Sequence, residues 1–200
     1  MLVFNKNNYH FNPFAGEETK AILQLINPIV KAKDILAYIA INSNCAIELC
    51  GAKGLGKTTH LHYLHQKIQG SLLADLDDIS LEDILKSKAK IILVDSINLF
   101  DFYTVFKLFR TNKTIIYTTH RSRKFTAFIT GKKLKTINFK PITAQILQTI
   151  ITNRLLLAQK SKEKVVDLVS TKSCDALIQQ YGTNHRTLIN KLYEIYQWDT

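Results

Sequence analysis

The residues best suited to chemistry lie in a glycine-rich run at positions 51–58, with the sequence GAKGLGKT. The run fits the pattern G-x-x-x-x-G-K-[ST] at each fixed position. Because glycine allows backbone torsions that other residues resist, successive N–H groups of such a run can turn inward around phosphate oxygens at the start of a helix. The run therefore predicts a phosphate-binding loop whose contact residues are Gly51, Ala52, Lys53, Gly54, Leu55, Gly56, Lys57, Thr58 and Thr59.

Two side chains at the end of this run carry the predicted chemistry. Lys57 supplies a mobile positive charge for the outer phosphates, and the hydroxyl of Thr58 is expected to coordinate Mg²⁺ between the β- and γ-phosphates. The flanks agree, because residues 45–50 form a short apolar run and residues 59–64 begin a helical pattern. The predicted cofactors are ATP and Mg²⁺, and a chance glycine-rich turn is the alternative.

A second metal ligand is predicted at Asp95. Residues 91–94 are Ile-Ile-Leu-Val, and Asp95 follows them directly. In a buried parallel strand such a carboxylate emerges at the carboxyl edge of the sheet, where the glycine loop also lies. We therefore expect Thr58 and Asp95 to hold the metal ion together.

The elements that must position these residues follow from the hydrophobic pattern. Short apolar runs predict five strands, at residues 45–50, 71–75, 91–95, 114–120 and 134–139. Helical spacing predicts helices within residues 16–42, interrupted near Pro28, and at residues 59–70, 80–86 and 100–110. Strands that alternate with helices predict an α/β fold of the P-loop NTPase class, with a five-stranded, mostly parallel sheet covered on both faces.

From residue 141 onward the pattern contains helices only. They are expected at residues 142–159, 162–170, 174–181 and 187–196. We therefore predict two domains: a nucleotide-binding α/β domain at residues 1–140, in which residues 1–42 are a helical lead-in, and a small helical lid at residues 141–200. The segment Phe11-Asn12-Pro13-Phe14 is expected to be extended, and its aromatic side chains to pack in the core rather than on an adenine ring.

Composition limits the classes of protein that fit. The cysteines Cys45, Cys50 and Cys174 lack the spacing of zinc ligands and indicate a reducing compartment. No stretch approaches 18 uncharged apolar residues, and the N-terminus lacks the basic-then-apolar layout of a secretory signal. We expect a cytoplasmic protein with no membrane partner.

The net charge of +11 is unevenly distributed. Residues 102–140 contain ten Lys or Arg and no acid, whereas residues 71–101 contain seven acids and three lysines. Three interpretations remain open: a nucleic-acid-binding surface, self-association of basic and acidic edges, and a solvated basic face without a partner. The candidate nucleic-acid contacts are Arg121, Arg123, Lys124, Lys132, Lys133 and Lys135.

Taken with the loop and Asp95, two further motifs give the chain a family resemblance. The strand end Thr118-Thr119-His120 and the tail Gly182-Thr-Asn-His-Arg186 resemble the AAA+ and related STAND ATPases over nearly the full length. The resemblance implies that Thr118 or Thr119 acts as sensor 1 and that Arg186 acts as sensor 2, reaching the phosphates from a lid helix. Together with Lys57 and Asp95, these are the predicted catalytic residues.

The same resemblance implies an oligomer in which a neighbouring subunit supplies an arginine. The candidates are Arg110, Arg121 and Arg123, each of which could equally be a surface or nucleic-acid contact. Compact size and the basic surface are most similar to AAA+ regulators of DNA transposition or replication.

One position departs from the family pattern. Ser96 stands where the family usually has a Glu that polarises the attacking water, and the nearest acid, Asp101, comes several residues later. We therefore expect ATP binding with slow or absent hydrolysis. The predicted function is an ATP-dependent switch that oligomerises and contacts nucleic acid. The alternatives are an adaptor that docks a partner protein without DNA, and a P-loop kinase in which residues 121–124 form an arginine-rich lid.

Overall fold

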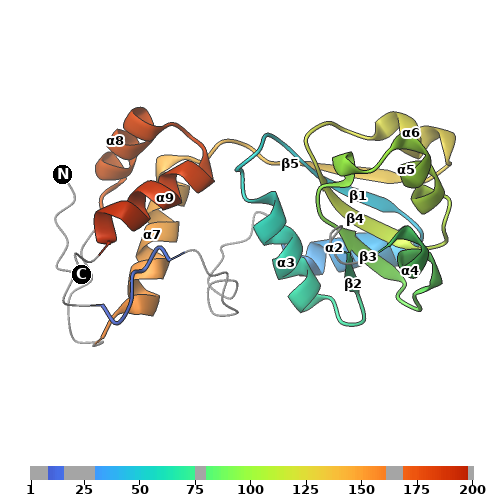
Figure 1. Cartoon of the computed structure of the whole chain (residues 1–200), viewed down its shortest axis with the longest axis horizontal. Coiled ribbons are helices and arrows are strands. Elements are labelled where there is room, and N and C mark those ends of the chain that lie inside the picture. The colour runs from blue at the N-terminus through green and yellow to red at the C-terminus, as the bar shows by residue number, and fades with distance from the viewer. Residues whose placement is uncertain (1–8, 16–29, 75–79, 161–168, 198–200) are drawn as a thin grey trace. The chain divides into compact units, whose positions relative to one another are not determined.

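A computed structural model describes residues 9–15, 30–74, 80–160 and 169–197. The chain divides into two compact units, one made of residues 28–139 and the other of residues 1–27 together with residues 140–200. We call the first the sheet unit and the second the helical unit, and each is described by itself (Figure 1).

The sheet unit contains one five-stranded sheet in the order β2-β3-β4-β1-β5. All four pairings between neighbouring strands are parallel. The predicted α/β class and the five strands are therefore confirmed, and the sheet is parallel throughout. The strands are β1 (Ala46–Cys50), β2 (Leu72–Ala74), β3 (Ile91–Val94), β4 (Thr114–Thr119) and β5 (Leu134–Asn138).

Helices cover both faces of this sheet, which is why its central strands are apolar on both sides. One core packs Ile47, Leu93 and Ile116 against α2 (Ala32–Ile41) and α3 (Lys57–Lys67). The other core lies against the opposite face, under the helices α4 (Leu81–Lys86), α5 (Phe102–Phe109) and α6 (Lys124–Ile129). Figure 1 shows α3 on one side of the sheet and α5 and α6 on the other.

The helical connections change face of the sheet between β1 and β4. The chain leaves β1 through α3, on one face, whereas it leaves β4 through α6, on the other face. Because β1 and β4 are neighbours, the chain diverges between them, and this is where open α/β sheets bind their ligands.

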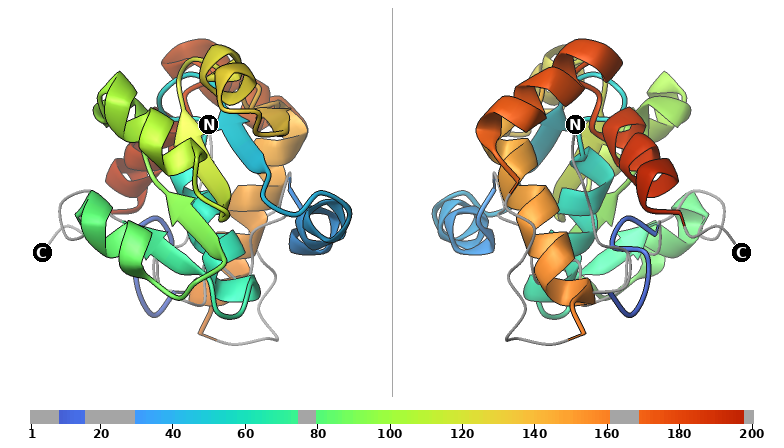
Figure 2. Two further views of the ribbon diagram at one scale, coloured as in Figure 1. Left: turned by 90° about the vertical axis from the view of Figure 1, so that its right-hand side faces the viewer. Right: turned by 90° about the vertical axis from the view of Figure 1, so that its left-hand side faces the viewer.

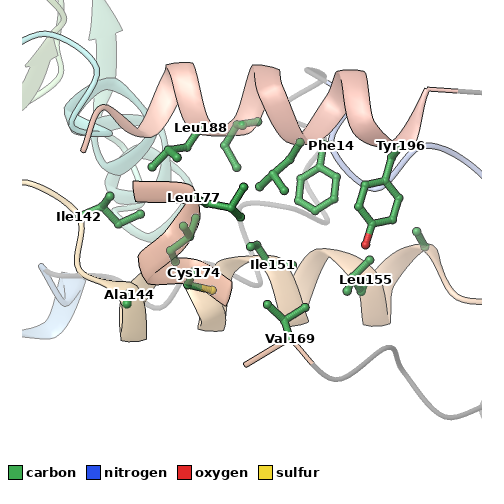
Figure 3. Close-up of a cluster of buried hydrophobic side chains, with 14 of the residues drawn as sticks. Phe14, Ile142, Ala144, Ile151, Leu155, Val169, Cys174, Leu177, Leu188 and Tyr196 are labelled. Atoms are coloured by element: carbon green, nitrogen blue, oxygen red, sulfur yellow. The ribbon is translucent and has the colours of Figure 1, made fainter. Parts of the chain in front are cut away.

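The helical unit consists of α7 (Ala144–Ala158), α8 (Thr171–Tyr181) and α9 (His185–Tyr196). Each helix begins at a residue whose side chain accepts a hydrogen bond from the first turn, and these N-caps are Thr143, Ser170 and Asn184. Their buried side chains form one core, in which the ring of Phe14 lies beside that of Tyr196 at 4.9 Å between centroids (Figure 3).

Residues 9–15 belong to the helical unit, not to the α/β domain to which they were assigned above. Tyr9 and Phe14 are buried in its core, and the backbone N–H of His10 donates to the carbonyl of Ala158 at 2.8 Å. The expected core packing of the segment's aromatic side chains is confirmed for Phe14 but wrong for Phe11, which is 47% exposed. Residues 13–14 form a turn instead of the expected extended segment, and the N–H of Ala15 donates to the carbonyl of Asn12 at 3.1 Å. The two compact units divide at residues 139 and 140, and the functional roles predicted for the two domains stay predictions.

Two expected helical segments lie wholly or partly outside the described residues, and one helix was not expected. Residues 16–29 and 161–168 lie outside the described residues. Val169 and Ser170 are not helical, and Ser170 instead caps α8. Helix α6 was not expected, because its exposed aromatic residues hide the usual polar and apolar periodicity.

Candidate phosphate-binding site

The glycine-rich loop joins the end of β1 to the start of α3. Gly54 and Gly56 have φ angles of 84° and 82°, a region that side-chain-bearing residues rarely adopt. Gly51 is required for another reason, because a Cβ there would lie 2.9 Å from the carbonyl oxygen of Phe139. Gly56 caps α3 without a side-chain hydrogen bond, so the helix presents its first N–H groups toward the loop.

Lys57 is the first residue of α3 and is 6% exposed. Its ammonium folds back over the loop and donates to the carbonyl oxygens of Gly51 at 2.9 Å and Ala52 at 2.7 Å. Burial lowers the pKa of Lys57, and the nearby carboxylate of Asp95 partly offsets this effect. A buried ammonium held only by neutral carbonyls would interact more strongly with an anion.

The side chain of Asp95 contacts both α3, the helix that follows the glycine-rich loop, and β4. The hydroxyl of Thr58 lies 3.2 Å and 3.1 Å from its two carboxylate oxygens. The hydroxyl of Thr118 also donates to Asp95, and it accepts a hydrogen bond from the backbone N–H of Ser96 at 2.7 Å. These contacts bring together three residues that the sequence placed far apart.

The strand register explains how Asp95 and Thr118 meet. Val94 lies opposite Tyr117 in the β3–β4 ladder, so the next residues of the two strands are neighbours. Side chains alternate between the faces of a strand, and Leu93 and Ile116 pack toward α3. Two residues later, Asp95 and Thr118 therefore emerge on the side where α3 begins.

The oxygen atoms of this cluster fit Mg²⁺. Mg²⁺ is bound in proteins by one or two carboxylates, with water and substrate phosphates completing the coordination. The carboxylate of Asp95 and the hydroxyl of Thr58 provide such a donor pair. Within the described residues no group of three or more His, Cys, Asp or Glu side chains gathers elsewhere as a competing site.

The structure distinguishes the two threonines at the end of β4. Thr118 contacts Asp95, whereas the hydroxyl of Thr119 donates to the carbonyl of Arg121 at 2.7 Å. The backbone N–H of Arg121 in turn donates a hydrogen bond to the Thr119 hydroxyl at 3.3 Å. The side chain of Thr119 thus stabilises a turn, and Thr118 is the residue placed to act on the metal ligand.

The positions after Asp95 bear on hydrolysis. Ser96 has a left-handed backbone, with φ 52°, and its side chain has no acid–base strength near neutral pH. Asp101 caps α5, where its carboxylate accepts from the backbone N–H of Thr104 at 2.9 Å and from its hydroxyl at 2.6 Å. The Thr104 hydroxyl lowers the pKa of Asp101, so this carboxylate is engaged as a helix cap.

The candidate arginines fall at different places. Arg110 ends α5, at the amino edge of the sheet and away from the loop. Arg121 and Arg123 follow β4 at the carboxyl edge, where they line a hollow of about 420 Å³ with Asn98, Thr119, His120 and Ser122. Arg186 is exposed in the first turn of α9, and its place in a lid helix and its reach to the phosphates stay predictions.

The six candidate nucleic-acid contacts do not form one patch. Arg121, Arg123 and Lys124 lie at the carboxyl edge of the sheet, whereas Lys133 precedes β5 at the amino edge. The Lys135 ammonium lies 4.5 Å from the centre of the Tyr38 ring, on the α2 face.

Lys132 differs most from its expected role. It is 5% exposed, and its ammonium donates to the carbonyls of Thr111 at 3.0 Å and Lys113 at 2.9 Å, and to the side chain of Asn44. Lys132 therefore ties together the amino ends of three strands. Burial lowers its pKa to about 8. Its proposed role in nucleic-acid binding is wrong because its charge is enclosed.

Sequence reasoning missed Glu48, a fully buried carboxylate on β1. It accepts from the hydroxyl of Tyr117 at 3.0 Å, the backbone N–H of Arg123 at 2.9 Å and the hydroxyl of Thr136 at 2.6 Å, and also from Ser122. Glu48 thus fixes the segment that carries Arg121 and Arg123. The signal was present, since an acid in the middle of an apolar strand needs buried partners.

Comparison with known proteins assigns no family to this chain: no protein-family model matches it, and a search of curated proteins finds no match. Among the helices of the described residues, none combines the length and the apolar character needed to span a bilayer.

Proposed function

We propose that this protein binds ATP with Mg²⁺ at the glycine-rich loop and acts as a nucleotide-dependent switch of the AAA+ and STAND kind. The observation that carries the proposal is a cluster of side chains near the carboxyl ends of β1 and β4, where the connections change face of the sheet. Its members are Lys57, Thr58, Asp95 and Thr118. It combines a buried cation, a metal-ligating pair and a hydroxyl that orients the carboxylate.

Each residue has a distinct task in this proposal. Loop N–H groups and the start of α3 cradle the phosphates, and Lys57 exchanges its two carbonyl partners for phosphate oxygens. Thr58 and Asp95 hold the metal, which neutralises charge on the phosphates when bound. Thr118 keeps Asp95 oriented through its hydroxyl.

Hydrolysis is slow in this account because no general base is supplied next to Asp95. Ser96 provides only its backbone N–H to Thr118, and Asp101 is used as a helix cap. ATP binding, rather than hydrolysis, then switches the protein between its states. Arg186 closes on the nucleotide, and an arginine from a neighbouring subunit completes the site. An oligomer forms in the ATP state and contacts nucleic acid through exposed cations.

Light scattering tests the switch. The proposal predicts a larger mass with Mg-ATP than without nucleotide, and Lys57→Ala should remain at the smaller mass. Lys67→Ala is the matched control, because Lys67 is exposed at the far end of the same helix. Equal masses of the wild-type protein with and without Mg-ATP would contradict the switch.

A second candidate function is an adaptor that binds ATP and docks a partner protein without touching DNA. The dispersal of the candidate basic residues favours it, because Lys132 is enclosed and Lys133 lies at the amino edge while Arg121 lies at the carboxyl edge. Titration with random duplex DNA at low salt separates the two functions, since phosphate contacts lose affinity steeply as salt is added.

A further inference from the structure

One side of the sheet unit carries aromatic side chains that face solvent instead of the core. The exposed fractions are 52% for Phe102 and 62% for Tyr103 on α5, and 69% for Phe125 and 83% for Phe128 on α6. The two helices contact one another on the same face of the sheet, and the left view of Figure 2 turns this side toward the viewer. We call these four rings, with Phe106, Lys107, Arg110 and Lys124, the α5–α6 surface.

On α5 the rings and cations are organised at helical spacing. Phe102 and Phe106 stack with centroids 6.2 Å apart, and the guanidinium of Arg110 lies 5.8 Å from the centre of the Phe106 ring. In a parallel row, the ammonium of Lys107 lies 4.3 Å from the centre of the Tyr103 ring. The opposite side of the helix supplies its contacts to the core through Val105, Leu108 and Phe109. These exposed rings are therefore additional to the packing that the fold requires.

Both signs of charge occur around this surface. The cations Lys107, Arg110 and Lys124 lie on it, whereas Asp101 caps α5 next to Phe102, and α4, which contacts α5, carries the exposed acids Glu82 and Asp83. At the carboxyl edge of the sheet, the hollow lined by Arg121 and Arg123 lies between the turn that precedes α5 and the loop that enters α6. The surface thus combines exposed aromatic side chains with cations, and the acids lie at its border.

We propose that the α5–α6 surface binds single-stranded nucleic acid, with bases stacked on the exposed rings and phosphates held by the neighbouring cations. Stacking on aromatic side chains together with backbone contacts to Lys and Arg is how single strands are bound without sequence preference. A duplex hides the faces of its bases and would leave these rings without a partner. An acidic amphipathic helix would need a continuous apolar groove, whereas here Lys107 and Arg110 lie against the rings themselves.

This inference sharpens the nucleic-acid contact of the proposed function and, for that contact, rests on it. It does not depend on the loop, because no residue of the α5–α6 surface belongs to the cluster around Asp95. The two proposals can therefore fail separately.

Fluorescence anisotropy of the full chain with labelled oligo(dT), oligo(U) and a duplex of equal length tests the inference. We expect salt-dependent binding of both single strands, with weaker binding of the duplex. The double variant Phe125→Ala with Phe128→Ala should bind oligo(dT) at least tenfold more weakly, and Phe102→Ala should lose affinity independently. The control is Ile41→Ala, because Ile41 is 82% exposed at the end of α2, on the opposite face of the sheet.

Other outcomes overturn the inference. Tighter binding of the duplex, or unchanged oligo(dT) affinity in the Phe125/Phe128 variant, would show that the rings do not stack on bases. Binding of polyglutamate but not of oligonucleotides would assign the surface to an acidic protein. If the protein mass falls when the rings are removed, and no oligonucleotide binds, the surface would be assigned to a second copy of the chain.

The two proposals can be told apart by their failures. If the chain binds Mg-ATP but no oligonucleotide, only the inference about the α5–α6 surface is contradicted. If it binds oligo(dT) through the rings but no ATP, only the proposed ATP site is contradicted.

Discussion

At the residue scale, Asp95 is the point where the loop helix and the sheet meet. Its carboxylate contacts hydroxyls from two different elements, Thr58 on α3 and Thr118 on β4. Such outer hydrogen bonds orient a metal-ligating carboxylate and strengthen its hold on the metal. The neighbouring threonine, Thr119, is engaged in a turn with Arg121 and gives an internal comparison.

Replacing the two threonines one at a time separates these roles. Thr118→Val keeps the shape of the side chain but removes the hydroxyl that contacts Asp95, so we expect the affinity for Mg-ATP to fall about tenfold or more. Thr119→Val should change that affinity by less than about twofold, although it loosens the turn. Titration calorimetry with Mg-ATP measures both, and equal effects of the two substitutions would argue against the assignment of Thr118.

The pKa of Lys57 predicts how nucleotide affinity depends on pH. Burial lowers this pKa below the usual 10.5, and only the charged ammonium attracts phosphate. Affinity should therefore be constant near neutral pH and decline as the pH rises through the lowered pKa, before 10.5 is reached. Bound phosphate stabilises the charged form, so alkaline binding should take up a proton.

Lys57→Arg is the control for this pH dependence. Arginine stays charged at all pH values of interest, so the alkaline decline should disappear even if the overall affinity is lower. Calorimetry in two buffers with different ionisation enthalpies measures the proton uptake. An unchanged alkaline decline in Lys57→Arg would mean that another group is responsible.

At the element scale, the amino ends of β1, β4 and β5 are joined by one buried ammonium. Lys132 donates to groups that precede β1 and β4 and lies two residues before β5 begins. Lys133, the next residue, is exposed, and its ammonium donates to the side chain of Asn42. Adjacent lysines thus have a structural and a surface role.

Methionine substitutions test that contrast. Lys132→Met keeps the volume but leaves buried carbonyl oxygens without a donor, so the free energy of unfolding should fall by about 1–3 kcal/mol. Lys133→Met should stay within about 0.5 kcal/mol of the wild type. Urea unfolding followed by circular dichroism gives both values. If the two variants are equally stable, Lys132 does not hold the strand ends together.

The elements differ in how far the sequence could predict them. The strands were predictable because runs such as residues 91–94 and 114–119 are apolar and short, and their ends carry polar residues that must reach an edge of the sheet. The strand order was not predictable, since it depends on which face each connecting helix covers. Burial of Lys132 escaped detection because lysine is usually exposed, and its partners precede two other strands, β1 and β4.

The residues of the candidate site also differ in whether the sequence could predict them. The loop, Thr58 and Asp95 could be assigned from motif and strand pattern alone. The choice between Thr118 and Thr119 required the β3–β4 register, because only one of two successive strand residues faces α3. Glu48 was missed although an acid inside an apolar strand signals buried partners. The rings of α5 and α6 were missed because no local pattern shows which aromatic residues stay exposed.

At the scale of the whole molecule, the chain consists of two cores whose residues are not grouped in sequence order. The helical unit takes in residues 9–15 from the N-terminus as well as everything after residue 140. Phe14 is 1% exposed in that core, whereas Phe11, three residues earlier, is 47% exposed. The N-terminal segment therefore contributes to the stability of the helical unit.

A matched pair of substitutions tests this membership. Phe14→Ala should lower the free energy of unfolding by about 3–5 kcal/mol, because it leaves a cavity beside Tyr196. Phe11→Ala should cost about 0.5 kcal/mol or less. Thermal unfolding measures both, and a Phe14→Ala variant as stable as Phe11→Ala would show that the segment does not pack in the helical core.

The central claim is that the glycine-rich loop binds the phosphates of a nucleotide, and calorimetric titration with ATP and Mg²⁺ tests it most directly. We predict one bound nucleotide per chain, loss of binding in Lys57→Ala, and retention of binding in Lys67→Ala. Absence of binding by the wild-type chain, or wild-type affinity in Lys57→Ala, would contradict the account.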